Sequence, residues 1–195
     1  GPFPMRTHGP GTTRRYVTVH DAVGSLPVIG NGFSNAEIAY EPVEPADPVE
    51  RAFFDKIRRF ASGRLIRDHV TSRHADYVIE RYRKIQPGGN WEDIKDMMTN
   101  YADLDRTHSN IYRRLKNDEP SITIGHYRKS MIIHPTQHRG LSLREASRLQ
   151  SFPDWFRFAG STNGARGGLT HRQQQLANAV CPLVTEAVAG FILHL

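Results

Sequence analysis

The chain has 195 residues, of which 38% are hydrophobic, and it carries a formal net charge of +6. This length is enough for one good core or two small lobes. Its single cysteine, Cys181, excludes an intrachain disulfide framework. No apolar stretch reaches the ~20 residues that span a bilayer, and no signal-peptide pattern opens the chain. We therefore expect no membrane partner, and we expect a bacterial-type cytoplasm or a nucleus as the compartment.

The positive charge is concentrated in the second half of the chain. Residues 106–148 hold nine Lys and Arg against three acids, whereas residues 31–50 hold five acids and neither Lys nor Arg. A basic domain with a pI near 9.7 favours a polyanionic partner such as nucleic acid. Basic domains without such a partner are also common, so charge alone does not decide the function.

The first part of the chain shows little periodicity. Residues 1–47 are rich in Gly, Pro and Thr, which predicts an extended arm or linker with one short strand at residues 16–19. Gly1-Pro2 is typical of the scar that a tag-removing protease leaves, in which case Met5 is a candidate native start.

Two helices are predicted next. Asp47-Pro48-Val49-Glu50 supplies an N-cap, a first-turn proline and an acid at the third position, and apolar residues follow at helical spacing up to a stop at Gly63. A second helix fits residues 73–86, which carry an apolar face and a basic face and end at Pro87-Gly88-Gly89.

The last third of the chain gives one weak signal and two strong ones. Residues 121–133 contain short β-leaning pieces and predict strands or a hairpin. Ser142-Leu143-Arg144-Glu145 is a capping box that opens a helix ending at Pro153. After a polar glycine-rich loop at residues 160–168, Pro182 begins a helix with a continuous apolar stripe. That stripe either closes the core of this chain or packs on another polypeptide.

Two strings near the C-terminus, HPTQHRGLSLREASRLQSFPDWFRFAGS and QQLANAVCPL, form a longer pattern. Together they resemble the ninth and tenth motifs of the DNA cytosine-5 methyltransferases. The matching residues are His134, Pro135, Arg139, Leu141, Arg144, Glu145, Arg148, Leu149, Gln150, Phe152, Pro153, Asp154, Gln175, Asn178, Ala179, Val180 and Pro182. Residues 108–124 and 7–27 also resemble family segments, so the resemblance covers nearly the whole chain.

The first half of an intact family member has no counterpart in this sequence. The glycine-rich cofactor motif, the Pro-Cys-Gln nucleophile loop and the Glu-Asn-Val motif are absent. The tenth motif also departs from the family pattern, with Ala177 in place of the usual glycine and Cys181 in place of a frequent proline. The resemblance thus implies that this chain holds no catalytic residue and cannot methylate cytosine alone.

The resemblance implies an α+β fold with three parts. These are an N-terminal arm (residues 1–47), a small mixed target-recognition domain (residues 48–138), and C-terminal helices (residues 139–195) that complete the Rossmann-like catalytic domain of a partner. The implied protein is the DNA-recognition subunit of a split cytosine-5 methyltransferase in the bacterial cytoplasm, associated with the nucleoid. Alternatives are a fragment of a single-chain enzyme and a freestanding DNA-binding module.

The implied cofactor is S-adenosylmethionine, shared with a catalytic subunit that carries the first eight motifs. The resemblance places Asn178 and Ala179 at the end of the cofactor pocket, although Asn178 is also a common turn residue. Cys181 stands at a helix start, which favours a lowered pKa, but no His, Lys or acid lies within several residues to activate it. We therefore interpret Cys181 as a structural thiol.

The implied macromolecular partner is double-stranded DNA. Basic residues interleaved with tyrosines suit a surface that neutralises phosphates and reaches base edges, although a solvated charged face is the alternative. The candidate DNA contacts are Arg106, Ser109, Asn110, Tyr112, Arg113, Arg114, Lys116, Thr123, Tyr127, Arg128 and Lys129. Arg139, Arg144 and Arg148 are expected to orient the recognition domain on the catalytic one.

The ten histidines raise the question of a metal site. His134 and His138 have i, i+4 spacing, but Pro135 is incompatible with a helix there and no cysteine cluster accompanies them. We expect no metal.

Overall fold

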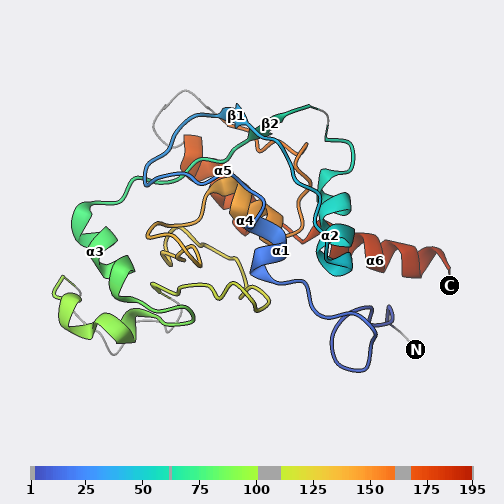
Figure 1. Cartoon of the computed structure of the whole chain (residues 1–195), viewed down its shortest axis with the longest axis horizontal. Coiled ribbons are helices and arrows are strands. Elements are labelled where there is room, and N and C mark those ends of the chain that lie inside the picture. Colours follow the sequence, from blue (N-terminus) through green and yellow to red (C-terminus); the bar gives the residue numbers. More distant parts are fainter. Residues whose placement is uncertain (1–2, 62, 101–110, 161–167, 195) are drawn as a thin grey trace.

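A computed structural model describes residues 3–61, 63–100, 111–160 and 168–194 (Figure 1). Within these ranges the helices are α1 (Val19–Val23), α2 (Pro48–Arg58), α3 (Asp76–Lys84), the 3₁₀ helix η1 (Trp91–Met97), α4 (Leu143–Leu149), α5 (Gly168–Ala177) and α6 (Pro182–Leu193). Strands β1 (Glu37–Ala39) and β2 (Leu65–Arg67) pair antiparallel, with Ile38 opposite Ile66. The fold is therefore mixed, with helices around one small sheet.

Three of the predicted helices are confirmed by their caps. Asp47 accepts hydrogen bonds from the backbone N–H groups of Val49 and Glu50, the second and third residues of α2, both at 2.9 Å. Ser142 and Glu145 form the reciprocal capping box of α4, at 3.0 and 2.7 Å. Pro182 is the first residue of α6. α2 ends at Arg58, before the predicted stop at Gly63.

Other predictions from sequence are wrong. Residues 16–19 do not form a strand, because Thr18 and Asp21 make a capping box that starts α1 at Val19. Residues 121–133 form turns instead of the predicted hairpin, and in the described ranges Ile133 makes only isolated bridges with Arg114 and Gly140. The helix expected at residues 73–86 is shorter, and η1 and α5 were not predicted.

The buried apolar side chains form two clusters. The main cluster draws on α1, α2, β2, α4 and α5, with Val19, Phe53, Ile66, Leu143 and Leu176 among its members. The second lies around α3 and η1, which form the lobe at one side of Figure 1. Residues 19–40 supply several members of the main cluster. The predicted N-terminal arm is therefore confined to the residues before Val19.

Buried ion pairs surround α4. The guanidinium of Arg139 donates to both carboxylate oxygens of Glu145, at 2.8 and 2.6 Å. Arg148 donates to both carboxylate oxygens of Asp154, at 2.9 and 2.6 Å. All four side chains are at most 3% exposed. Burial opposes ionisation of Glu145, but the hydrogen bonds and charge of Arg139 outweigh it and hold the pKa of Glu145 at about 2.

Arg144 is the third buried arginine of this region, and most of its donors meet backbone carbonyls. It donates to the carbonyl oxygens of Arg67, Pro153 and Phe156, at 2.8, 3.2 and 3.0 Å. The carboxylate of Asp68 lies 3.7 Å from it. Arg144 thereby links α4 to the end of β2 and to the chain that follows α4.

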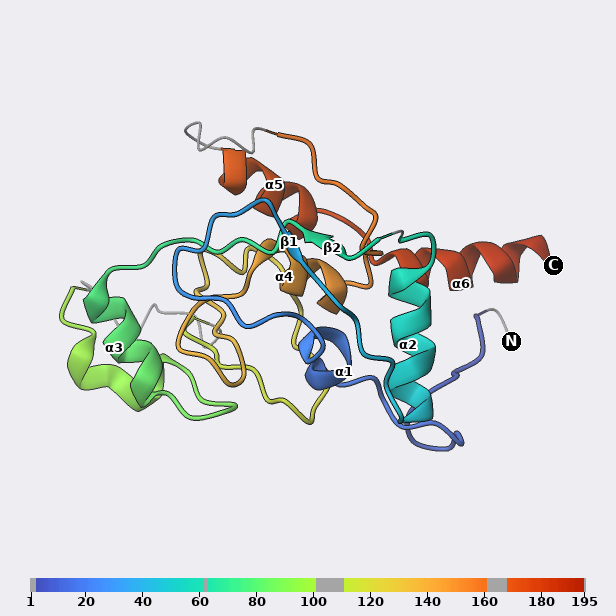
Figure 2. The same cartoon turned by 45° about the horizontal axis from the view of Figure 1, so that its top comes forward.

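The apolar stripe of α6 is exposed. None of the residues of α6 is buried, and the exposed fractions of Val184, Val188 and Ile192 are 56%, 43% and 60%. Leu183, in the first turn, packs against the main cluster. Figures 1 and 2 show the helix extending beyond α2, away from the body of the molecule. The stripe therefore does not close the core of this chain.

The segment Gly168–Leu193 is long and apolar enough, by length and composition, to cross a membrane. This differs from the expectation from sequence that no such segment exists. The chain leaves the helical conformation between α5 and α6, which have 10 and 12 residues, so neither helix alone reaches the ~20 residues of a membrane span.

His134 makes the stability of this region sensitive to pH. Its Nδ1 accepts from the backbone N–H groups of Thr136 and Gln137, at 3.2 and 3.1 Å, so this nitrogen carries no proton. Burial lowers the pKa of His134 to about 4, although the charge of Glu145 opposes the shift. Because the unfolded state binds a proton near the ordinary histidine pKa of about 6.5, stability falls as the pH drops from there toward 4.

We predict that the free energy of unfolding decreases by about 1–2 kcal/mol between pH 7 and pH 5 because of His134. Glu145 stays ionised over this range. The variant His134→Asn keeps an oxygen acceptor for the two N–H groups but does not titrate, so its stability should decline less. Urea unfolding followed by circular dichroism measures both proteins. An equal decline in the two would contradict the assignment to His134.

Candidate nucleic-acid interface

The candidate contacts of the basic region lie on two neighbouring segments. Residues 112–116 run beside residues 130–133, with the N–H of Tyr112 donating to the carbonyl of Ser130 at 2.9 Å and that of Leu115 to Ile133 at 3.1 Å. The turn at residues 126–131 follows directly on the segment that contains Thr123. Three further candidates, Arg106, Ser109 and Asn110, lie outside the described residues.

Tyr112 is buried. Its side chain is 1% exposed, and its hydroxyl accepts a hydrogen bond from Arg81 at 3.0 Å. It belongs to the cluster around α3 and η1. Tyr112 therefore has a structural role, and we withdraw it from the candidate DNA contacts.

Arg114 is also buried and connects α3 to the segment after residue 133. Its guanidinium donates to the carbonyls of Tyr82 and Ile85 at the C-terminal end of α3, at 2.5 and 2.7 Å, where a cation complements the helix dipole. It also donates to the carbonyls of His134 and Gln137, at 2.7 and 3.0 Å. Because its donors are engaged inside the protein, Arg114 is likewise withdrawn.

The other described candidates reach the surface to different degrees. Thr123, Arg128 and Lys129 are exposed, and Arg113 is half-buried. Lys116 is exposed and pairs with Glu119 at 2.6 Å. Arg128 and Lys129 are thus the two cations of the 126–131 turn that face solvent.

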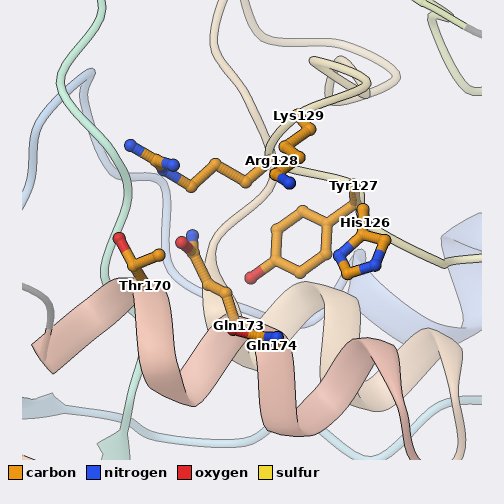
Figure 3. A pocket seen from close by; sticks show the side chains of 7 residues that line it. All are labelled: His126, Tyr127, Arg128, Lys129, Thr170, Gln173 and Gln174. Atoms are coloured by element: carbon orange, nitrogen blue, oxygen red, sulfur yellow. The ribbon is translucent and has the colours of Figure 1, made fainter.

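A small cavity of about 70 Å³ lies between this turn and α5 (Figure 3). It is lined by His126, Tyr127, Arg128, Lys129, Thr170, Gln173 and Gln174, a set without a carboxylate. The Tyr127 hydroxyl points toward Gln173 in Figure 3. The Tyr127 hydroxyl and Gln173 Oε1 are both buried, and neither has a hydrogen-bond partner of good geometry in the described part of the chain.

The state of the Tyr127 hydroxyl follows from its surroundings. Burial raises the pKa of Tyr127, and the nearby Gln173 amide offsets this only in part, so the hydroxyl keeps its proton. The sequence had singled out Tyr127, Arg128 and Lys129 but not Thr170, Gln173 or Gln174. The glutamine run THRQQQ lacks the apolar periodicity that would have indicated a helix facing this turn.

A larger groove of about 790 Å³ lies between the N-terminal arm, α2, residues 120–125 and α6. Its wall is more apolar than polar, and it includes Phe53, Ile122, Thr123, Ala179 and Leu183. Arg14 and Lys56 add positive charge at the same groove. This groove is continuous with the exposed start of α6.

The residues between α5 and α6 lie next to this groove. Asn178 is exposed and extends the last turn of α5, its N–H donating to the carbonyl of Gln174 at 3.1 Å. Ala179 packs partly against the main cluster. Cys181 is the N-cap of α6, and burial raises the pKa of its thiol, which is the opposite of what a thiolate nucleophile requires.

Comparison with known proteins gives consistent matches. Residues 44–194 match the family of C-5 cytosine-specific DNA methylases. Type II methyltransferase M1.HphI of Haemophilus parahaemolyticus is 33% identical over 99% of this chain and 40% of its own length. Type II methyltransferase M.AquIB of Picosynechococcus sp. is 34% identical over 64% of this chain and 85% of its own length.

A solved structure is also similar. The crystal structure of a protein named as a DNA modification methyltransferase of an E. coli prophage superposes with a TM-score of 0.64 at 25% identity. The match covers 94% of this chain and 48% of that one. This chain thus spans less than half the length of that structure and of M1.HphI.

We predict that Arg114→Lys lowers the free energy of unfolding by about 2–3 kcal/mol, because one ammonium cannot serve the carbonyls that the guanidinium bridges. The neighbouring Arg113→Lys is the matched control and should change stability by at most about 0.5 kcal/mol. Urea denaturation measures both variants. Equal effects of the two substitutions would contradict the role assigned to Arg114.

Proposed function

The chain belongs to the C-5 cytosine-specific DNA methylase family, and on this premise we propose that it is the DNA-recognition subunit of a split cytosine-5 methyltransferase. The complete enzyme transfers a methyl group from S-adenosylmethionine to carbon 5 of cytosine in duplex DNA. A separate catalytic subunit carries the first eight motifs and the Pro-Cys-Gln loop. This chain binds the DNA, and its α6 packs on the catalytic subunit.

The exposed apolar stripe of α6 carries the proposal. Val184, Val188 and Ile192 follow one another at helical spacing on α6 and are between 43% and 60% exposed, and Val180, just before the helix, is 69% exposed. Contiguous apolar surface of this kind on a soluble protein marks an interaction site. The neighbouring groove, lined by Ala179 and Leu183, extends the same surface.

The lengths of the relatives support a particular kind of partner for this surface. M1.HphI aligns with this chain over 40% of its own length, so most of that methyltransferase has no counterpart here. M.AquIB supports a division into two chains, because the alignment takes up 85% of that relative. The partner that packs on the apolar stripe of α6 is accordingly a polypeptide that supplies the rest of the enzyme.

Asn178 and Ala179 suit the edge of a cofactor site. The exposed Asn178 amide offers both a donor and an acceptor, and the small Ala179 side chain lets a ligand approach the backbone. S-adenosylmethionine supplies the methyl group when bound. Within this chain, Asn178 and Ala179 hold one end of it, and the catalytic subunit supplies the remaining contacts.

Duplex DNA meets the basic side of the chain. Arg113, Lys116, Arg128 and Lys129 neutralise phosphates, and Thr123 contacts the backbone or a base edge. Arg106, Ser109 and Asn110, outside the described residues, are further proposed DNA contacts on the ground of the sequence alone.

The proposal predicts that methyl transfer requires both chains. We expect methyl-labelled cofactor to label duplex DNA only when this chain is mixed with a catalytic polypeptide that carries the first eight motifs. Val188→Asp places a charge within the apolar stripe and should reduce labelling at least about tenfold without unfolding this chain, because Val188 is solvent-exposed. Glu186→Gln on the same helix is the control. It removes an exposed pair with Lys56, at 3.7 Å, and should leave labelling unchanged.

Labelling by either chain alone would overturn the split arrangement. Absence of labelling from the folded pair would also overturn it and would favour a freestanding DNA-binding module. Equal activity of the Val188→Asp and wild-type pairs would remove α6 from the interface.

A second prediction concerns the cofactor. Asn178→Ala should raise the KM of the pair for S-adenosylmethionine about tenfold or more, because a hydrogen-bonding amide is lost. Duplex affinity, measured by fluorescence anisotropy, should stay within about twofold of wild type, since the substitution does not touch the basic segments. Reduced DNA affinity with an unchanged KM would contradict this assignment.

A further inference from the structure

The cavity between the 126–131 turn and α5 has the chemistry of an anion site. Its rim carries the exposed cations Arg128 and Lys129, and its wall carries the donors of Tyr127, Thr170 and Gln173. Figure 3 shows the Gln173 amide between Thr170 and the Tyr127 hydroxyl. A set of cations and neutral donors with no carboxylate favours a negatively charged ligand.

The buried polar groups of the cavity are a second, independent indication. Tyr127 is 2% exposed, and its hydroxyl is a donor without a hydrogen-bond partner of good geometry among the described residues. Gln173 is 5% exposed, and its unpaired atom is the acceptor Oε1, so only the N–H groups of its amide can face an anion. Such atoms cost free energy unless a ligand or water pairs with them. Thr170 lies in the first turn of the 10-residue helix α5, whose dipole also favours an anion.

The cavity has room for a small anion. Its volume of about 70 Å³ holds several water molecules, since about 10–15 Å³ of this kind of space holds one. The cavity therefore accommodates the oxygens of one tetrahedral oxyanion.

We propose that this cavity binds one backbone phosphate of duplex DNA, with Tyr127, Thr170 and Gln173 donating to its oxygens and Arg128 closing over it. The inference rests on the proposed function, because it takes DNA as the source of the phosphate. It adds α5 to the DNA-binding surface. The same helix leads at its other end to Asn178, so one rigid element connects the phosphate to the end of the cofactor site.

The test measures binding of a fluorescent duplex to the full chain by anisotropy over a range of salt concentrations. Tyr127→Phe and Thr170→Val each remove one hydroxyl and should weaken binding about fivefold to tenfold. Because the buried hydroxyl has no partner of good geometry within the described part of the protein, the thermal unfolding midpoint of Tyr127→Phe should equal or exceed that of the wild type. Tyr16→Phe, in the N-terminal arm, is the matched control and should bind as wild type.

A double variant tests whether one phosphate is shared. Arg128→Gln should weaken binding and reduce the salt slope by about 0.9, the value for one phosphate contact. The variant Tyr127→Phe/Arg128→Gln should lose less affinity than the product of the two single losses, because both side chains contact the same group. Strictly multiplicative losses, or wild-type affinity of Tyr127→Phe, would overturn the inference.

Competition with inorganic phosphate distinguishes a site for a DNA backbone phosphate from a site for a free anion. Millimolar phosphate should compete weakly with the duplex for the wild-type chain and not for Tyr127→Phe. If phosphate binds at Tyr127 while duplex affinity does not depend on Tyr127, the cavity is a site for a free anion and the DNA assignment is wrong. If the chain binds no duplex at low salt, the proposed function itself fails, whatever phosphate does.

Discussion

The arrangement of the main cluster depends on the buried ion pairs that arginine side chains form around α4. Arg139 and Arg148 pair with Glu145 and Asp154 in bidentate geometry, and they also reach the carbonyls of Ile29 and Ala22 in the N-terminal part of the chain. Removing one partner from such a buried pair typically costs about 3–5 kcal/mol, because the remaining charge is left unpaired. These arginines therefore fix the position of α4 inside the protein, and the expectation that they orient the recognition domain on a catalytic domain stays a prediction.

α5 extends this rigid centre to both proposed functional surfaces. It packs against α4, and its Arg172 pairs with the buried carboxylate of Asp68, which also lies near Arg144. The start of α5 faces the basic 126–131 turn, and its end leads through Asn178 to α6. The proposed phosphate cavity and the proposed cofactor edge thus lie at opposite ends of α5, which the buried ion pair of Arg172 and Asp68 holds in place.

Local signals in the sequence predicted part of this structure. The caps and first-turn prolines of α2, α4 and α6 are encoded within a few residues, and those helices begin where expected. The β-branched residues before α1 favour a strand, which is why the sequence did not predict a helix start at its capping box. α5 has no apolar stripe that would identify it as a helix. For the site, charge and aromatic content selected the correct segment but not the orientation of each side chain. Tyr112 and Arg114 point inward because of contacts with α3, and Thr170 and Gln173 join the cavity from the other side of the fold, which no local pattern encodes.

From the sequence alone, the apolar stripe of α6 is compatible with packing on the core of this chain or on another protein. Its exposure in the structure favours the second, and its length adds a physical argument. Isolated helices shorter than about 12–15 residues are marginal in water, and α6 has 12 residues, none of which is buried. Its stability must then come largely from the surface on which it packs. Asn178 and Ala179 lie four and three residues before the first residue of α6. Under the proposed function, docking of the helix therefore also brings the proposed cofactor edge into place.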